Sequence, residues 1–177
     1  MLSRLLSERS VYRWSALLAG AVFVLLLSDT RATAADVAAL FQEARSTATQ
    51  LNRDAATMES FTRSNLNWKS HSAQITRIKD HINKAGSILS EMQAARGEAK
   101  PWHQDAIDVI TPALKELASN TESIINHLNE NPQNLKDPTY MQYLKSNAQS
   151  ASELAAAVGN AVDYDRTRTR MDELEAK

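Results

Sequence analysis

Two histidines of this 177-residue chain are placed where they could bind a cofactor. His71 falls on the apolar stripe of a predicted helix, where an imidazole costs free energy unless a partner accepts or donates a hydrogen bond. If the following helix packs back against this one, His71 lies level with Asn126 or His127. Two imidazoles, or an imidazole and a methionine thioether, suit the axial positions of a b-type haem, and imidazole with carboxylate suits Zn or Cu.

The turns between the predicted helices bring further side chains to this same end of the fold. The side chains gathered there are His71, His127, Met58, Met141, Glu59, Tyr140 and Tyr143. The two histidines and two methionines are therefore candidate ligands for haem b or a transition metal. The alternative is purely structural, because methionines commonly fill gaps in cores. We expect no cofactor and keep haem or metal binding as the alternative.

The other histidines and the tryptophans have simpler interpretations. His81 lies about 15 Å along the helix from His71, so the two rings cannot share one ion. We interpret His81 and His103 as solvated or partly buried surface rings. Trp68 and Trp102 each open a predicted helix, where an indole can cover the end of the core.

Motifs of catalysis are missing from the sequence. It has no Gly-rich phosphate loop, no G-x-S-x-G elbow, no H-E-x-x-H pair and no di-iron Glu-x-x-His signature. It has no cysteine, which excludes disulfides, thiolate metal sites, covalently attached c-type haem and a lipidated cysteine. We therefore expect no catalytic residues and a protein that is not an enzyme.

Helices must position these residues, and the apolar spacing indicates four of them. Apolar side chains recur at alternating steps of three and four, the spacing of helices that pack along a seam. The predicted helices cover about 36–64, 68–96, 101–131 and 138–172. The first seam consists of Val37, Phe41, Ala44, Ala48, Leu51, Ala55 and Met58.

The order of these helices predicts the fold class. Pro112 lies inside the third helix, where we expect a kink near 108–111 rather than two separate helices. Short connections make successive helices antiparallel neighbours. Residues 35–177 are therefore predicted to form an all-α, up-down-up-down antiparallel four-helix bundle, preceded by an N-terminal signal helix. Seams this regular can also be satisfied between two chains, which would make a homodimer.

Residues 1–34 have the pattern of a secretory signal peptide. Arg4, Arg9 and Arg13 precede an apolar run at 14–27, which is short for a membrane span, and an Ala-Thr-Ala sequence follows at 32–34. We predict cleavage after Ala34 or Ala35. In the alternative, residues 14–27 stay as an anchor and the rest is a membrane-tethered ectodomain. Either arrangement places the domain outside the membrane, in the periplasm or the extracellular space.

Charge and composition narrow the class of partner. The formal net charge is −1, and residues 1–34 hold more basic than acidic side chains, so the remainder is more acidic. No basic stripe suggests nucleic acid. The leading hypothesis is an exported, non-enzymatic bundle that binds or organises an unknown protein or another component of the cell envelope.

Overall fold

The computed structural model describes residues 34–177, and this part of the chain is helical, with no strand. The all-α prediction is confirmed. The predicted signal peptide, apart from Ala34, lies outside the described residues and stays a prediction. The helices are α1 (Ala34–Ser60), α2 (Trp68–Ala94), α3 (Pro101–Glu130) and α4 (Pro138–Glu175), with 3-10 turns at Phe61–Arg63 and Arg96–Glu98.

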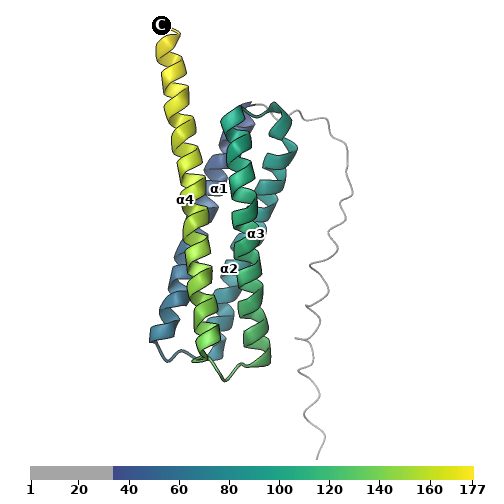
Figure 1. Ribbon diagram of the computed structural model, residues 1–177, viewed down its shortest axis with the longest axis vertical. Coiled ribbons are helices and arrows are strands. Elements are labelled where there is room, and N and C mark those ends of the chain that lie inside the picture. Colours follow the sequence, from purple (N-terminus) through teal and green to yellow (C-terminus); the bar gives the residue numbers. More distant parts are fainter. Residues whose placement is uncertain (1–33) are drawn as a thin grey trace, which may run out of the picture. The chain divides into compact units, whose positions relative to one another are not determined.

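The four helices lie side by side (Figure 1). α1 packs against α2 and α4, and α3 packs against the same two helices, so each helix contacts its neighbours in the chain and α4 closes the ring against α1. α4 is the longest, with 38 residues, and its C-terminal turns project past the ends of the other helices (Figure 1). The projecting turns leave one stretch of α4 without the neighbours that cover the rest.

The helix boundaries depart from the predicted ones by a few residues. α1 ends at Ser60 instead of continuing to residue 64, because the chain tightens into a 3-10 turn. Hydroxyl groups favour this turn: Ser60 Oγ donates to the Thr57 carbonyl at 2.6 Å, and Ser64 Oγ donates to the Phe61 carbonyl at 3.1 Å. α4 runs three residues beyond its predicted end, to Glu175.

Side-chain caps begin α2 and α4. Asn67 Oδ1 accepts a hydrogen bond from the Ser70 amide at 3.2 Å. Asp137 Oδ1 accepts from the amides of Thr139 and Tyr140 at 2.8 and 3.2 Å. These oxygens satisfy amides that have no partner inside a helix. The Asn67 cap therefore fixes the start of α2, and the Asp137 cap fixes the start of α4, which carries Tyr140.

α3 runs unbroken through Pro112, as predicted for a single helix. Proline has no amide hydrogen, so the Asp108 carbonyl loses its usual helical partner. Beside it, Thr111 Oγ1 donates to the Ile107 carbonyl at 2.7 Å. The packing of α3 against α2 and α4 is enough to keep the two halves in one helix.

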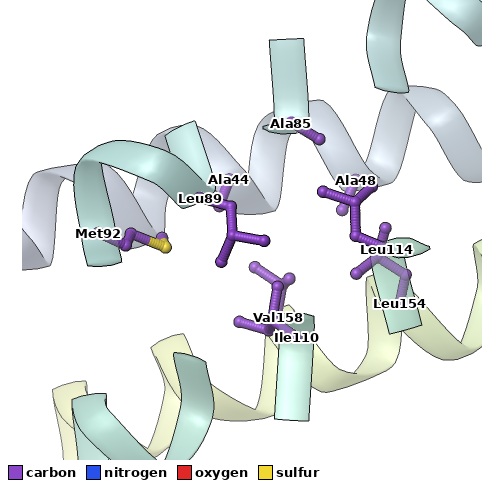
Figure 2. Close-up of a pocket in the computed structure, with 9 residues that line it drawn as sticks. All are labelled: Ala44, Ala48, Ala85, Leu89, Met92, Ile110, Leu114, Leu154 and Val158. Atoms are coloured by element: carbon purple, nitrogen blue, oxygen red, sulfur yellow. The ribbon is translucent and has the colours of Figure 1, made fainter. Parts of the chain in front are cut away.

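Small side chains allow α1 to approach the other helices closely. Ala44 and Ala48 of α1 line the same small pocket as Leu154 and Val158 of the neighbouring helix α4 (Figure 2). Alanine loses little side-chain entropy on burial and lets helix axes come near one another. The alanine-rich seams of α1 and α4 are thus part of the core.

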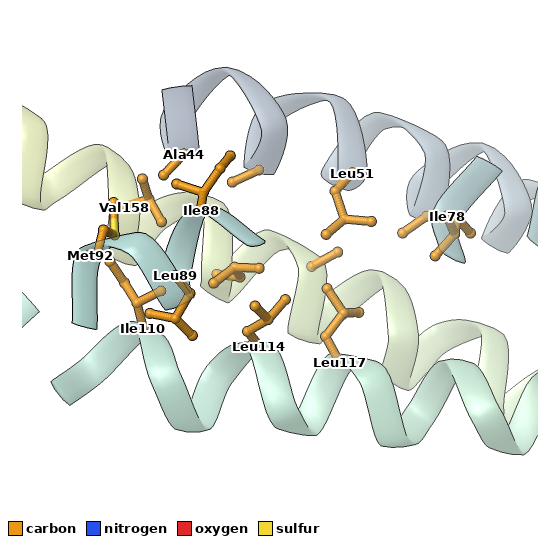
Figure 3. Close-up of a cluster of buried hydrophobic side chains, with 14 of the residues drawn as sticks. Ala44, Leu51, Ile78, Ile88, Leu89, Met92, Ile110, Leu114, Leu117 and Val158 are labelled. Carbon is orange, nitrogen blue, oxygen red and sulfur yellow. The ribbon is translucent and has the colours of Figure 1, made fainter. Parts of the chain in front are cut away.

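The core is continuous across all four helices (Figure 3). Leu51, Ile78 and Leu117, from α1, α2 and α3, are fully shielded from solvent. Each such side chain stabilises the fold by about 1.5–3 kcal/mol relative to its exposed state. With no cysteine in the chain, this packing holds the helices together without disulfides.

Candidate functional site

His71 has a hydrogen-bond partner from α4. Its ring is 2% exposed, and Nδ1 lies 2.8 Å from the hydroxyl of Tyr140. Tyr140 is itself fully buried, and burial raises the pKa of its phenol, which keeps the hydroxyl protonated. Each group therefore satisfies the other inside the core.

Tyr140 also brings His127 into the cluster. The rings of Tyr140 and His127 are stacked with centroids 4.6 Å apart, and the rings of Tyr140 and His71 lie 5.7 Å apart. The edge of Phe61 contacts His71 at 5.1 Å. The structure thus gathers both predicted histidines around one phenol, which we call the Tyr140 cluster (Phe61, His71, His127 and Tyr140).

The two methionines named as candidate ligands lie on α1 and α4. Met58 is 1% exposed and belongs to the hydrophobic core. Met141 is half-buried and follows Tyr140 directly in α4. Burial of Met58 among apolar side chains is the usual role of a gap-filling thioether.

The electrostatics of the Tyr140 cluster oppose a bound cation. Burial lowers the pKa of His71, and the nearby charge of Lys136 lowers it further. Lys136 is held in place because its Nζ donates to the carbonyls of Thr62 and Ser64 at 3.3 and 2.5 Å. Within residues 34–177, no group of three or more His, Cys, Asp or Glu side chains is arranged to hold a metal ion.

A second polar cluster lies where α3 begins. We call it the Asp165 cluster (Trp102, His103 and Asp165). His103, interpreted from the sequence as a surface ring, is 1% exposed, so that interpretation is wrong. Its Nε2 lies 2.9 Å from Oδ1 of Asp165, and Trp102 Nε1 donates to the same oxygen at 3.1 Å. The ring of His103 stacks on Phe41 of α1 at 4.9 Å. One carboxylate of α4 is therefore bound by two neighbouring residues of α3.

The contact of His103 with Asp165 is close, but it is not a well-aligned hydrogen bond. The distance is short, but neither ring nitrogen meets hydrogen-bond geometry with any described residue. Burial lowers the pKa of His103, while the charge of Asp165 acts in the opposite direction and Lys100 adds to the lowering. A neutral ring in the folded state is the consequence, at a cost in stability if it is protonated.

Of the two tryptophans predicted to cover the ends of the core, Trp68 does not do so. Trp68 is 42% exposed, so it does not cover the core end; α2 is packed only from its next turn, where His71 is buried. Trp102 is half-buried and has its edge contact with Tyr164, at 6.1 Å between ring centroids. His81 is half-buried beside Asp54, at 2.9 Å. Its interpretation as a partly buried ring agrees with this position.

Two hollows lie between the helices of the described residues. An apolar pocket of about 20 Å³ lies between the helices and is lined by alanine, leucine, isoleucine, valine and methionine side chains (Figure 2). This volume holds at most one water, which would find no polar partner. A groove of about 350 Å³ runs between α2 and α3, past Ile82, Leu89 and Leu114. No polar side chain lines the apolar pocket, whereas the groove is also bordered by Asn83, Thr111 and Lys115.

None of the helices in residues 34–177 combines the length and the hydropathy needed to cross a bilayer. Comparison of the chain with protein-family models, curated proteins and solved structures found no match.

Proposed function

We propose that this protein is an exported, non-enzymatic four-helix bundle of up-down-up-down topology that binds or organises a component of the cell envelope. Export is supported by the order of Arg4, Arg9 and Arg13, the apolar run 14–27, and the small residues at 32–34. The bundle supplies a rigid scaffold, and its working surface is the end of α4.

The projecting end of α4 is the observation that carries this proposal. Met171 and Leu174 are exposed by 44 and 62% near the C-terminal end of α4, whose last turns project past the other helices (Figure 1). Tyr164, earlier in the helix, is 52% exposed and contacts the edge of Trp102 at the start of α3. Helical segments of this length are marginal in water unless an apolar face is packed. An apolar face on an unpacked helix is also the feature that partner helices recognise. Binding of a partner would bury these side chains and stabilise the turns that carry them.

Native mass spectrometry of the protein purified from its host checks export and cofactor content together. We expect a polypeptide that begins at Ala35 or Asp36, because small residues precede both bonds, and a mass equal to that polypeptide alone. A chain that still contains residues 14–27 would contradict cleavage and favour the tethered ectodomain. Added mass of a haem or a metal ion would contradict the cofactor-free proposal.

A haem- or metal-binding bundle is the second candidate, and the contact of His71 and His127 with Tyr140 favours it. A hydrogen bond at Nδ1 leaves Nε2 for a ligand, which is the arrangement that orients metal-bound histidines. Lys136 argues against it, since a fixed positive charge beside His71 raises the cost of a cation. We therefore rank it below the binding role.

Site-specific crosslinking in intact cells tests the role of α4. With a photoreactive amino acid in place of Leu174, we expect crosslinked products, because this side chain is exposed on the proposed binding surface. The matched control has the same amino acid in place of Val109, an apolar residue of α3 that is 58% exposed. Equal products from both positions, or none from position 174, would contradict binding through α4.

A further inference from the structure

The exposed side chains at the end of α4 form a regular stripe. Tyr164, Thr167, Met171 and Leu174 follow one another at steps of three, four and three residues, and all four are exposed. This is the a, d, a, d pattern of a two-stranded coiled coil. It lies on the opposite face from the buried seam residues Val158 and Val162, so most of the stripe stays exposed while α4 is packed in its own bundle. Tyr164 is 52% exposed and also contacts the ring of Trp102.

We propose that the partner of this stripe is a second copy of the same chain, aligned in parallel. The inference rests on the proposed function, because it names the partner of the surface described there. In the register set by the stripe, Asp163 and Arg170 occupy g positions, and Arg168 and Glu175 occupy e positions. A parallel pair places each g residue beside the e residue five positions further along the other helix.

Charge is complementary at every such position. Asp163 of one copy meets Arg168 of the other, and Arg170 meets Glu175, so the two-fold symmetric pair has opposite charges at all four flanking contacts. Charges at e and g positions set both the choice of partner and the orientation of a coiled coil.

The antiparallel alternative is disfavoured by the same residues. An antiparallel pair that matches Tyr164 with Leu174 and Thr167 with Met171 aligns each Arg168 with its symmetry copy. It does the same for Arg170. The repulsion between these like charges destabilises the antiparallel pair. The charge pattern therefore favours the parallel pair.

Existing contacts of these charged groups are exposed and can be exchanged. Asp163 pairs with Arg45 at 2.8 Å, and its side chain is 57% exposed. Arg168 lies 3.6 Å from Asp172, with 40 and 49% exposure of the two side chains, and its guanidinium lies over the Trp102 ring at 5.7 Å from the ring centre. Ion pairs at the surface stabilise a fold only slightly, so replacing them by contacts across the dimer costs little.

The pairing is expected to be weak and reversible. From Tyr164 to Leu174 the stripe spans about 15 Å, which is less than two full heptads, and it has a threonine at one core position. Stable coiled coils commonly need three or more heptads. We therefore expect a monomer–dimer equilibrium that depends on protein concentration, rather than an obligate dimer.

Analytical ultracentrifugation over a range of concentrations tests the dimer in the mature protein. Leu174→Lys is expected to weaken dimerisation by about tenfold or more, because it places two like charges at a core position. Val109→Lys, on α3, is the matched control and should dimerise as the native protein does. Arg170→Glu and Glu175→Arg should each weaken dimerisation, and the double variant should restore it. A monomer at all concentrations, or a dimer that Leu174→Lys leaves intact, would overturn the proposal.

Orientation is tested by a single introduced thiol, which is unambiguous because the chain has no cysteine. Leu174→Cys should form a disulfide-linked dimer under mild oxidation, since the two positions face one another only in the parallel pair. Val109→Cys should not. If the native protein dimerises but this variant does not crosslink, the parallel register is overturned. If the chain stays monomeric while the photoreactive residue at 174 captures a different protein, the second copy is excluded and the proposed binding role stands.

Discussion

Replacing Tyr140 by alanine is expected to lower the free energy of unfolding by about 3–5 kcal/mol. Tyr140 is among the largest fully buried side chains, and its ring stacks on His127. Its removal leaves a cavity and also takes away the hydrogen-bond partner of His71 Nδ1. A loss of this size is a large fraction of the stability of a single domain, which is about 5–15 kcal/mol.

Urea unfolding followed by circular dichroism measures this loss, and Tyr140→Phe is the matched control. The phenylalanine keeps the ring and removes only the hydroxyl, so we expect a smaller loss of about 1–3 kcal/mol from the unpaired His71. The two variants thereby separate the contribution of ring packing from that of the hydrogen bond at position 140. A Tyr140→Ala variant no less stable than Tyr140→Phe would show that the Tyr140 cluster does not contribute to the core.

Acidification is expected to destabilise the protein strongly, through two buried histidines. Burial lowers the pKa of both His71 and His103 below the ordinary value of 6.5. Below pH 6.5 these histidines bind more protons in the unfolded chain than in the folded chain. The free energy of unfolding therefore falls as the pH falls. The contribution of each neutral ring to the free energy of unfolding is fully present above pH 6.5. It is lost as the pH falls from 6.5 to the pKa of that ring in the folded state. The steepest slope is about 1.4 kcal/mol per pH unit for each histidine.

Urea titrations at several pH values between neutrality and pH 5 check the slope. His103→Gln should flatten the pH dependence, because it removes one of the two buried titrating rings. His81→Gln leaves both of those rings in place and should retain the loss of stability in acid. An unchanged slope in the His103→Gln and His71→Gln variants would contradict a role for either ring. The native protein serves as reference at each pH.

The core was predictable because burial in a helical bundle follows a short repeat along the chain. Every member of the first predicted seam, from Val37 to Met58, is buried in α1. Helix ends were harder, since they depend on single hydrogen bonds such as the one from Ser60 to the Thr57 carbonyl. The seam pattern carries no information about such local competition between side chain and backbone.

The side-chain contacts of the two candidate sites were only partly predictable from the sequence. Matching the heights of antiparallel helices placed His71 and His127 at one end, but it did not single out Tyr140 as the group between them in the network of contacts. His103 was misinterpreted because the residues that surround its ring, Phe41 and Asp165, each lie sixty-two positions away in the chain. Yet Asp165 continues the heptad of Val158 and Val162, and that phase was the available signal.

The two polar clusters also determine how α4 responds to force. One end of this helix is held through Tyr140, and about 38 Å further along the rise of the helix Asp165 is held by Trp102 and His103. A rod that is fixed at two distant points cannot pivot about either. Displacement of the projecting end of α4 is therefore resisted by α2 and α3 as well as by α1, so the helix moves with the bundle rather than independently of it.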